Sequence, residues 1–215
     1  MAMNAQIHEV GVFVGVSNFV GDVGRTDYIY PNKPAIGITY KWNKSPRHSY
    51  RFSYTQTNLR GNDVVSKEAR RYLRGYSFDN SIKEVSLGLE FNFFNFDLHK
   101  SETKITPYIF SGINYTIYDG LFFVNSKTKY DSNHGTISIP ITIGVKTNIN
   151  RFLILGFEIG PRYTFADDID GSNPTNKNLK QFRLGFGNIN NNDWYVFSGL
   201  TLTYTFGEKP CYCAE

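Results

Sequence analysis

Residues 10–16 read Val-Gly-Val-Phe-Val-Gly-Val, and this stretch decides the fold through its period of two. The four valines share one parity, whereas Gly11, Phe13 and Gly15 share the other. Side chains alternate between the two faces of a β-strand, so this period predicts a strand with one apolar face. The same division of large apolar residues from glycine recurs to the C-terminus, for example in segments 139–144 and 199–204.

The pattern predicts eight strands joined by connections of alternating length. The strands are expected near residues 7–16, 34–42, 47–57, 81–94, 104–115, 136–147, 152–165 and 194–206. Long connections cover 17–33, 58–80, 116–135 and 166–193, and shorter ones cover 43–46, 95–103 and 148–151. An even number of strands with short turns at one end and long loops at the other is typical of an antiparallel, up-and-down outer-membrane β-barrel.

Composition agrees with a single all-β domain. The 215 residues suffice to close one sheet, and they include 15 Tyr and 18 Phe but only 20% charged residues. A net charge of +4 with scattered Lys and Arg does not favour nucleic-acid binding. No apolar run approaches the roughly 20 residues of a transmembrane helix, so any membrane crossing must use strands.

The face opposite the large apolar residues decides between lipid and water. That face carries small and hydroxyl side chains: Gly11, Gly15, Gly37, Gly88, Gly112, Gly144, Gly156, Gly160, Gly199, Ser49, Ser53, Ser86, Ser138, Thr39, Thr142, Thr201 and Thr203. Glycine weakens a strand on a solvated surface but makes room inside a tight barrel. We therefore expect lipid on the apolar face and a packed lumen. A soluble, lipocalin-like carrier is the alternative with the faces reversed.

Balanced charges on the lumen face predict a plugged barrel. These are Glu9, Glu84, Glu90 and Glu158 with Lys41, Arg51, Lys146 and Arg162. Buried charges persist when they are paired, so the eight residues are expected to form one internal network, or alternatively a path for protons or ions. The middle of the apolar face carries no charge, as a bilayer requires.

Aromatic residues are expected to form a belt at each rim. The turn end carries Tyr40, Trp42, Tyr50, Phe93, Phe152, Tyr204 and Phe206, and the loop end carries Tyr115, Tyr163, Phe165 and Trp194. Aromatic side chains gather at membrane interfaces, and Trp42 and Phe206 are expected to anchor the lower rim. Segment 104–115 is less regular, since Tyr108 and Phe110 make both of its faces apolar; it is expected to contact a partner or a loop folded into the lumen.

Catalytic and metal motifs are weak. No two of the four histidines have metal-ligand spacing, and His48 and Ser49 point to opposite faces of a strand. We therefore expect no enzymatic activity, no cofactor and no small-molecule substrate. The acidic run 167–171 resembles half of a calcium loop without its closing glutamate, so a polar loop tip is expected. Segment 66–74 has helix formers, but inside a long loop it predicts a surface turn.

The two termini carry separate hypotheses. Residues 1–6 lack the basic and apolar regions of an export signal, and we expect a trimmed end or a misplaced start codon; a short terminus on a cytoplasmic protein is the alternative. Residues 207–215 follow the barrel, 7–206, as a periplasmic tail that holds the only two cysteines, Cys211 and Cys213. A bridge between them would be strained, so they are expected either to link to another protein or to stay idle.

Ordered motifs along the chain resemble PorG-like proteins, outer-membrane barrel components of the type IX secretion system. They are His8-Glu9-Val10-Gly11-Val12-Phe13, Ser17-Asn18, Gly21-Asp22-Val23-Gly24, Leu59-Arg60-Gly61-Asn62-Asp63, Arg74-Gly75-Tyr76-Ser77-Phe78, Glu90-Phe91-Asn92-Phe93-Phe94, Thr106-Pro107-Tyr108, Pro161-Arg162-Tyr163-Thr164-Phe165, Asn191-Asn192-Asp193-Trp194-Tyr195-Val196-Phe197 and the Cys-Tyr-Cys tail.

The resemblance implies a non-enzymatic part of the protein secretion and gliding machinery. Such proteins associate with a periplasmic ring of the lipoprotein PorK and its partner PorN. If this holds here, the side bearing both termini meets the ring, and Cys211, Tyr212 and Cys213 are the expected contact. The alternative is an OmpA-like surface barrel that binds an extracellular ligand or serves envelope integrity.

Overall fold

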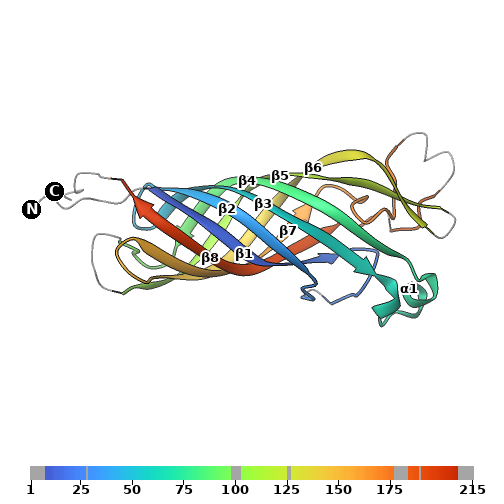
Figure 1. Ribbon diagram of the computed structural model, residues 1–215, viewed down its shortest axis with the longest axis horizontal. Coiled ribbons are helices and arrows are strands. Elements are labelled where there is room, and N and C mark those ends of the chain that lie inside the picture. The colour runs from blue at the N-terminus through green and yellow to red at the C-terminus, as the bar shows by residue number, and fades with distance from the viewer. Residues whose placement is uncertain are drawn as a thin grey trace, which may run out of the picture.

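The chain forms a closed barrel of eight antiparallel strands that follow one another in sequence order (Figure 1). The computed structural model describes residues 8–27, 29–97, 103–124, 127–176, 184–188 and 190–207. The strands are β1 (His8–Val20), β2 (Lys33–Asn43), β3 (His48–Asn62), β4 (Ser77–Asn92), β5 (Ile105–Val124), β6 (Lys127–Asn148), β7 (Leu153–Thr164) and β8 (Trp194–Phe206). Pairing of β1 with β8 closes the sheet, which confirms the predicted architecture.

Strands β5 and β6 continue far beyond their predicted ends. They contain 20 and 22 residues, and their ladder reaches Val124 opposite Lys127 after a register shift between Asp119 and Leu121. Most of the predicted loop 116–135 is therefore a β-hairpin, and that prediction was wrong. Residues 121–124 are apolar in succession and residues 125–134 are polar except for Tyr130, so the segment lacks the alternation by which a strand is found in a sequence.

The β3–β4 connection is also more ordered than predicted. A 3-10 turn, Asp63–Val65, precedes the helix α1, Ala69–Arg74, so the prediction of a simple surface turn was wrong. Gly75 ends the helix with φ 63°, a conformation that glycine adopts without strain. The Arg74 guanidinium donates to Asp63 Oδ2 at 2.6 Å and to the Asp22 carbonyl at 2.7 Å, which fixes the helix against the barrel.

The outer face is apolar and the lumen is polar, as predicted. Val14, Ile36 and Leu87 are each about 60% exposed on the outer wall, because nothing in the chain covers them. The opposite parity buries Ser, Thr and charged side chains, such as Ser86 at 1% exposure. Among the described residues, none of the helices is long and apolar enough to cross a membrane.

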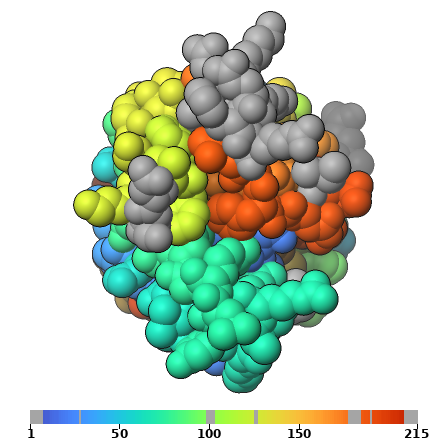
Figure 2. Space-filling model, turned by 90° about the vertical axis from the view of Figure 1, so that its right-hand side faces the viewer, coloured from blue at the N-terminus to red at the C-terminus, as the bar shows by residue number. Residues whose placement is uncertain are grey.

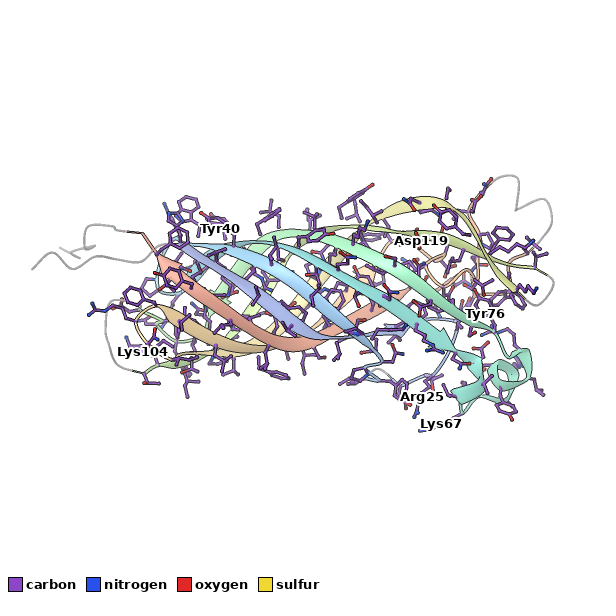
Figure 3. The ribbon with its side chains drawn as sticks, viewed as in Figure 1. Arg25, Tyr40, Lys67, Tyr76, Lys104 and Asp119 are labelled. Carbon is purple, nitrogen blue, oxygen red and sulfur yellow. The ribbon has the colours of Figure 1, made fainter. Side chains whose placement is uncertain are left out.

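An apolar core fills the loop end of the lumen. It includes Phe19, Leu59, Tyr76, Phe78, Ile169 and Tyr195, drawn from six strands or connections. In Figure 3, Tyr40 and Lys104 lie at the turn end of the barrel, and Tyr76 and Asp119 lie at the loop end.

Glycine is required where β4 and β5 meet, because Gly88 lies directly opposite Gly112. A Cβ on Gly88 would lie 2.2 Å from the Ser111 carbonyl oxygen, and one on Gly112 would lie 2.1 Å from that of Leu87. Both contacts are with backbone, so neither can be relieved by a side-chain rotation.

Gly88→Ala is expected to destabilise the barrel by about 1 to 3 kcal/mol, because the added methyl group forces the two strands apart. Urea unfolding of the refolded protein in lipid vesicles measures this loss. Ser86→Ala is the matched control on the same face of β4, because the buried Ser86 hydroxyl has no hydrogen-bond partner among the residues that the structure describes, and its removal should cost nothing. Equal effects of the two variants would contradict the close-approach argument.

Candidate functional site

The turn half of the lumen is centred on Glu90, which bridges two lysines. Glu90 Oε1 accepts a hydrogen bond from Lys41 Nζ at 2.9 Å and from Lys146 Nζ at 2.6 Å. All three residues are at most 2% exposed. Strands β2, β4 and β6 supply one residue each, so this ion cluster ties together strands that are not neighbours.

A second ion pair lies beside the first. Arg51 donates through Nη1 and Nη2 to Glu158 at 2.8 and 2.9 Å, and the Tyr108 hydroxyl donates to Glu158 at 2.7 Å. The Arg51 guanidinium also lies 4.9 Å from the centre of the Phe110 ring. Tyr108 and Phe110 therefore point into the lumen and pack on these ions, whereas the expected contact of this strand with a partner or an inserted loop stays a prediction.

The remaining three lumen charges lie apart from these two clusters. Arg162 Nε lies 3.4 Å from Glu84 Oε1, and the Tyr195 hydroxyl donates to Glu84 Oε2. Glu9 has no cation within ion-pair distance among the described residues; it accepts from Asn43 at 2.8 Å and Thr203 at 3.1 Å. Arg51 Nη1 also lies 3.7 Å from Glu90 Oε2, so five of the eight charged residues form one connected network. The expectation of one network of eight was wrong only for Glu9 and for the Glu84–Arg162 pair, which have no ion pair with these five among the described residues.

An acidic cluster closes the loop end, and we call Asp22, Asp167, Asp168, Asp170 and Asp193 the acidic cap. The sequence predicted an exposed loop tip at 167–171, and this was wrong: Asp168, Ile169 and Asp170 are at most 2% exposed. Asp193 reaches back from the start of β8, and its Oδ2 accepts the Ile169 amide at 3.0 Å. Figure 2 shows the β7–β8 connection, in orange, seated over the middle of this end.

Burial raises the pKa of three carboxyls of the acidic cap. Loss of solvent, together with the nearby charge of Asp22, raises the pKa of Asp170 to about 7 and that of Asp167 to about 6. Burial also raises the pKa of Asp193 well above its ordinary value. Within the described ranges, Asp170 Oδ2 and Asp167 Oδ1 are buried without a hydrogen-bond partner, and both carboxyls have other carboxyls as neighbours.

Asp168 differs from the rest of the acidic cap because it is hydrogen-bonded on both oxygens. Its Oδ1 accepts from the Tyr118 hydroxyl at 2.5 Å, and its Oδ2 lies 2.9 Å from His134 Nδ1 and 2.8 Å from the Thr175 hydroxyl. Thr175 contacts Asp168 rather than His134, so these residues do not have the geometry of a hydrolase triad. In the ranges that the structure describes, no group of three or more His, Cys, Asp or Glu residues is arranged to hold a metal ion.

The rim aromatics lie at the two ends of the barrel where the sequence placed them. Trp42 packs against Tyr50 with ring centres 5.5 Å apart, and Phe206 packs on His8 at 5.6 Å. Cys211, Tyr212 and Cys213 lie outside the described residues. Phe206 pairs with His8, so the barrel begins and ends at the turn end.

The closed eight-stranded wall, its uncharged apolar band and its polar lumen define an outer-membrane β-barrel, which places the chain in the outer membrane. The chain belongs to the family described as a domain of unknown function, DUF6089, whose model matches residues 1–215. No curated protein matches the sequence.

Three solved structures share the fold at low sequence identity. Neisserial surface protein A (NspA) matches with a TM-score of 0.55 and 10% identity, covering 93% of this chain and 97% of that one. Ail of Yersinia pestis, solved with the heparin analogue sucrose octasulfate, matches at 0.50 and 11%, covering 94% and 99%. The N-terminal barrel of Pseudomonas aeruginosa OprF gives the same TM-score, identity and coverage. At such identities the likeness establishes the fold alone.

Proposed function

We propose that this barrel is a non-enzymatic component of the type IX secretion and gliding machinery that anchors a periplasmic ring of the PorK/PorN type to the outer membrane. The observation that carries the proposal is the position of Phe206, after which the cysteine-bearing residues follow in the sequence. Phe206 lies at the end of the barrel where β1 begins, β8 ends and the short turns lie. In an outer-membrane barrel with an even number of strands, that end faces the periplasm.

The lumen supports an anchoring role rather than transport through the barrel. Its charged residues are at most 5% exposed, and aromatic rings pack between them, so side chains occupy the cross-section. A rigid, filled barrel of this size is suited to hold a tail at a fixed place on the membrane.

Removal of residues 208–215 is expected to abolish co-purification with the ring proteins and to stop secretion, while the barrel still shows heat-modifiable migration in a gel. The barrel should survive because β8 is complete at Phe206. A Cys211→Ser/Cys213→Ser variant tests the covalent contribution, with Glu215→Gln as a matched control that leaves Cys211, Tyr212 and Cys213 in place. Unchanged secretion after the truncation would overturn the proposal.

The alternative is an OmpA-like surface barrel, and the ordered loop end favours it. Asp63 accepts from Arg74, from the Gly24 amide and from the Tyr76 amide, so the β3–β4 connection is held in one arrangement. Binding surfaces on barrels are built from such loops. This function predicts that the truncated protein keeps its activity while replacement of residues 64–74 abolishes it.

A further inference from the structure

Beyond the last ladder pair of β4 and β5 the wall of the barrel opens into a hollow. The ladder ends with Ile82 opposite Tyr118, and the Asn80 side chain then bonds both backbone groups of Asp119, at 2.9 and 2.8 Å. Farther out the β5–β6 hairpin touches β4 again, where the Thr128 hydroxyl donates to the Ser77 carbonyl at 2.8 Å. The strands thus separate between two fixed points, next to the β3–β4 hairpin.

The hollow has a volume of about 550 Å³, in the usual range for ligand sites. Phe78 and Leu121 form a dry floor, at 3% and 7% exposure. The Tyr130 ring stands at the wall with 56% of the side chain exposed. Asp119, Lys129 and the Thr128 hydroxyl add polar groups. Carboxylate acceptors, cationic donors and an exposed ring in one hollow suit a polyhydroxylated ligand that carries negative charge.

Arg60 lines this hollow, and the carboxylate with which its guanidinium would be expected to form an ion pair is bound by other residues. Arg60 lies directly opposite Asp79 in the β3–β4 ladder, where oppositely charged residues normally pair. The Asp79 carboxylate is instead taken by Lys33 of β2 and by the Asn58 amide, which donates at 2.9 Å. In the part of the chain that the structure describes, neither Arg60 nor Lys129 has an ion-pair or hydrogen-bond partner for its charged group.

The height of the hollow above the membrane identifies the source of the ligand. On the outer face of β3 and β4 the last apolar pair is Tyr54 with Val85, and Gln56 with the exposed Lys83 follows. Arg60 lies six residues beyond Tyr54, which is about 20 Å along the strand and roughly 15 Å along the membrane normal at the usual tilt. Lys83 thus lies near the headgroup phosphates, and the hollow lies among the sugars above them.

We propose that the hollow binds the saccharide headgroup of lipopolysaccharide in the outer leaflet, with Arg60 and Lys129 contacting its anionic groups and Tyr130 packing on a sugar ring. Lys83 lies on the path between the hollow and the bilayer, where a phosphate of the same molecule can reach it. Because this site lies on the loop end, it does not depend on the proposed role of the tail.

Binding of fluorescent rough-type lipopolysaccharide to the full chain in detergent micelles tests the proposal. Arg60→Ala/Lys129→Ala is expected to raise the Kd about tenfold, through the loss of two charge-assisted contacts. The matched control, Lys67→Ala/Lys127→Ala, removes the same charge from the same end outside the hollow and should leave the Kd within about twofold. Equal weakening in both variants, or none in the first, would overturn the site.

Two further arms separate the sugar from the lipid. Oligosaccharide released from the lipid should compete with the whole molecule, whereas phosphorylated lipid A without core sugars should compete poorly; the reverse order would overturn recognition of the saccharide. Tyr130→Ala should weaken binding and Tyr130→Phe should not, because the Tyr130 hydroxyl is engaged by Asn133 at 2.9 Å rather than offered to the hollow. Heat-modifiable migration verifies that each variant is folded.

Discussion

Glu90→Gln is expected to lower the free energy of unfolding by about 3 to 5 kcal/mol, because it leaves two buried lysines with one neutral acceptor. Lys41 and Lys146 lie within 2.9 Å of Glu90 Oε1 and are 2% exposed, so neither ammonium can recover its hydration. Urea unfolding in lipid vesicles, followed by tryptophan fluorescence, measures the change.

Glu9→Gln is the matched control for this prediction. Glu9 is equally buried, at 1% exposure, but it accepts from neutral Asn43 and Thr203. Its replacement should cost about 1.5 to 3 kcal/mol, the usual loss for a hydrogen bond to a charged group. A Lys41→Met/Glu90→Gln/Lys146→Met variant removes all three charges and should regain most of the lost stability. If Glu9→Gln costs as much as Glu90→Gln, the ion cluster is not the source of the effect.

The acidic cap is expected to lose stability as the pH rises from about 4 to about 7. The pKa of Asp170 is raised to about 7 in the folded protein and returns to 3.8 on unfolding, so the folded state binds more protons within this window. Stability therefore falls as the pH rises through it, by up to about 4 kcal/mol for a shift of three units. Below the window the contribution is fully present, and above it the loss is complete.

Urea midpoints measured between pH 4 and pH 8 test this prediction. Asp170→Asn should reduce the pH dependence and stabilise the protein at pH 8, because the amide stays neutral and its oxygen can still accept the Ser172 amide. The remaining slope belongs to Asp167 and Asp193, whose pKa values are also raised. Asp131→Asn, on the neighbouring β5–β6 hairpin, should keep the slope of the natural chain. A slope that Asp170→Asn leaves unchanged would show that Asp170 does not bind the protons.

The strand pattern could be predicted from the sequence because the membrane imposes it. Within the bilayer every outward residue must be apolar, so Val10 to Val16 reveal both the strand and its lipid face. Above the membrane both faces of a hairpin can be polar, and the alternation disappears. For this reason β5 and β6 were predicted to end near 115 and 136, although their ladder continues to Val124 and Lys127.

The lumen charges could be predicted as a set, whereas their partners could not. The alternation of side chains alone placed Glu90 and Lys146 inside the barrel. Which cation pairs with which carboxylate depends on the stagger of the strands and on rings such as Tyr108 that pack beside these charges. The acidic cap was missed for a similar reason. Asp170 reads as a polar loop residue until the fold brings Asp22 and Asp193, more than twenty residues away on either side, to the same place.

The pairing of β1 with β8 has a consequence for the order of events in assembly. The two strands are the first and last of the barrel, and their thirteen residue pairs join His8 to Phe206. A chain still emerging from synthesis or from the export machinery therefore has two open sheet edges until its final strand arrives. Whatever escorts it through the periplasm must shield both edges until then, and the residues after Phe206 are the last to be released.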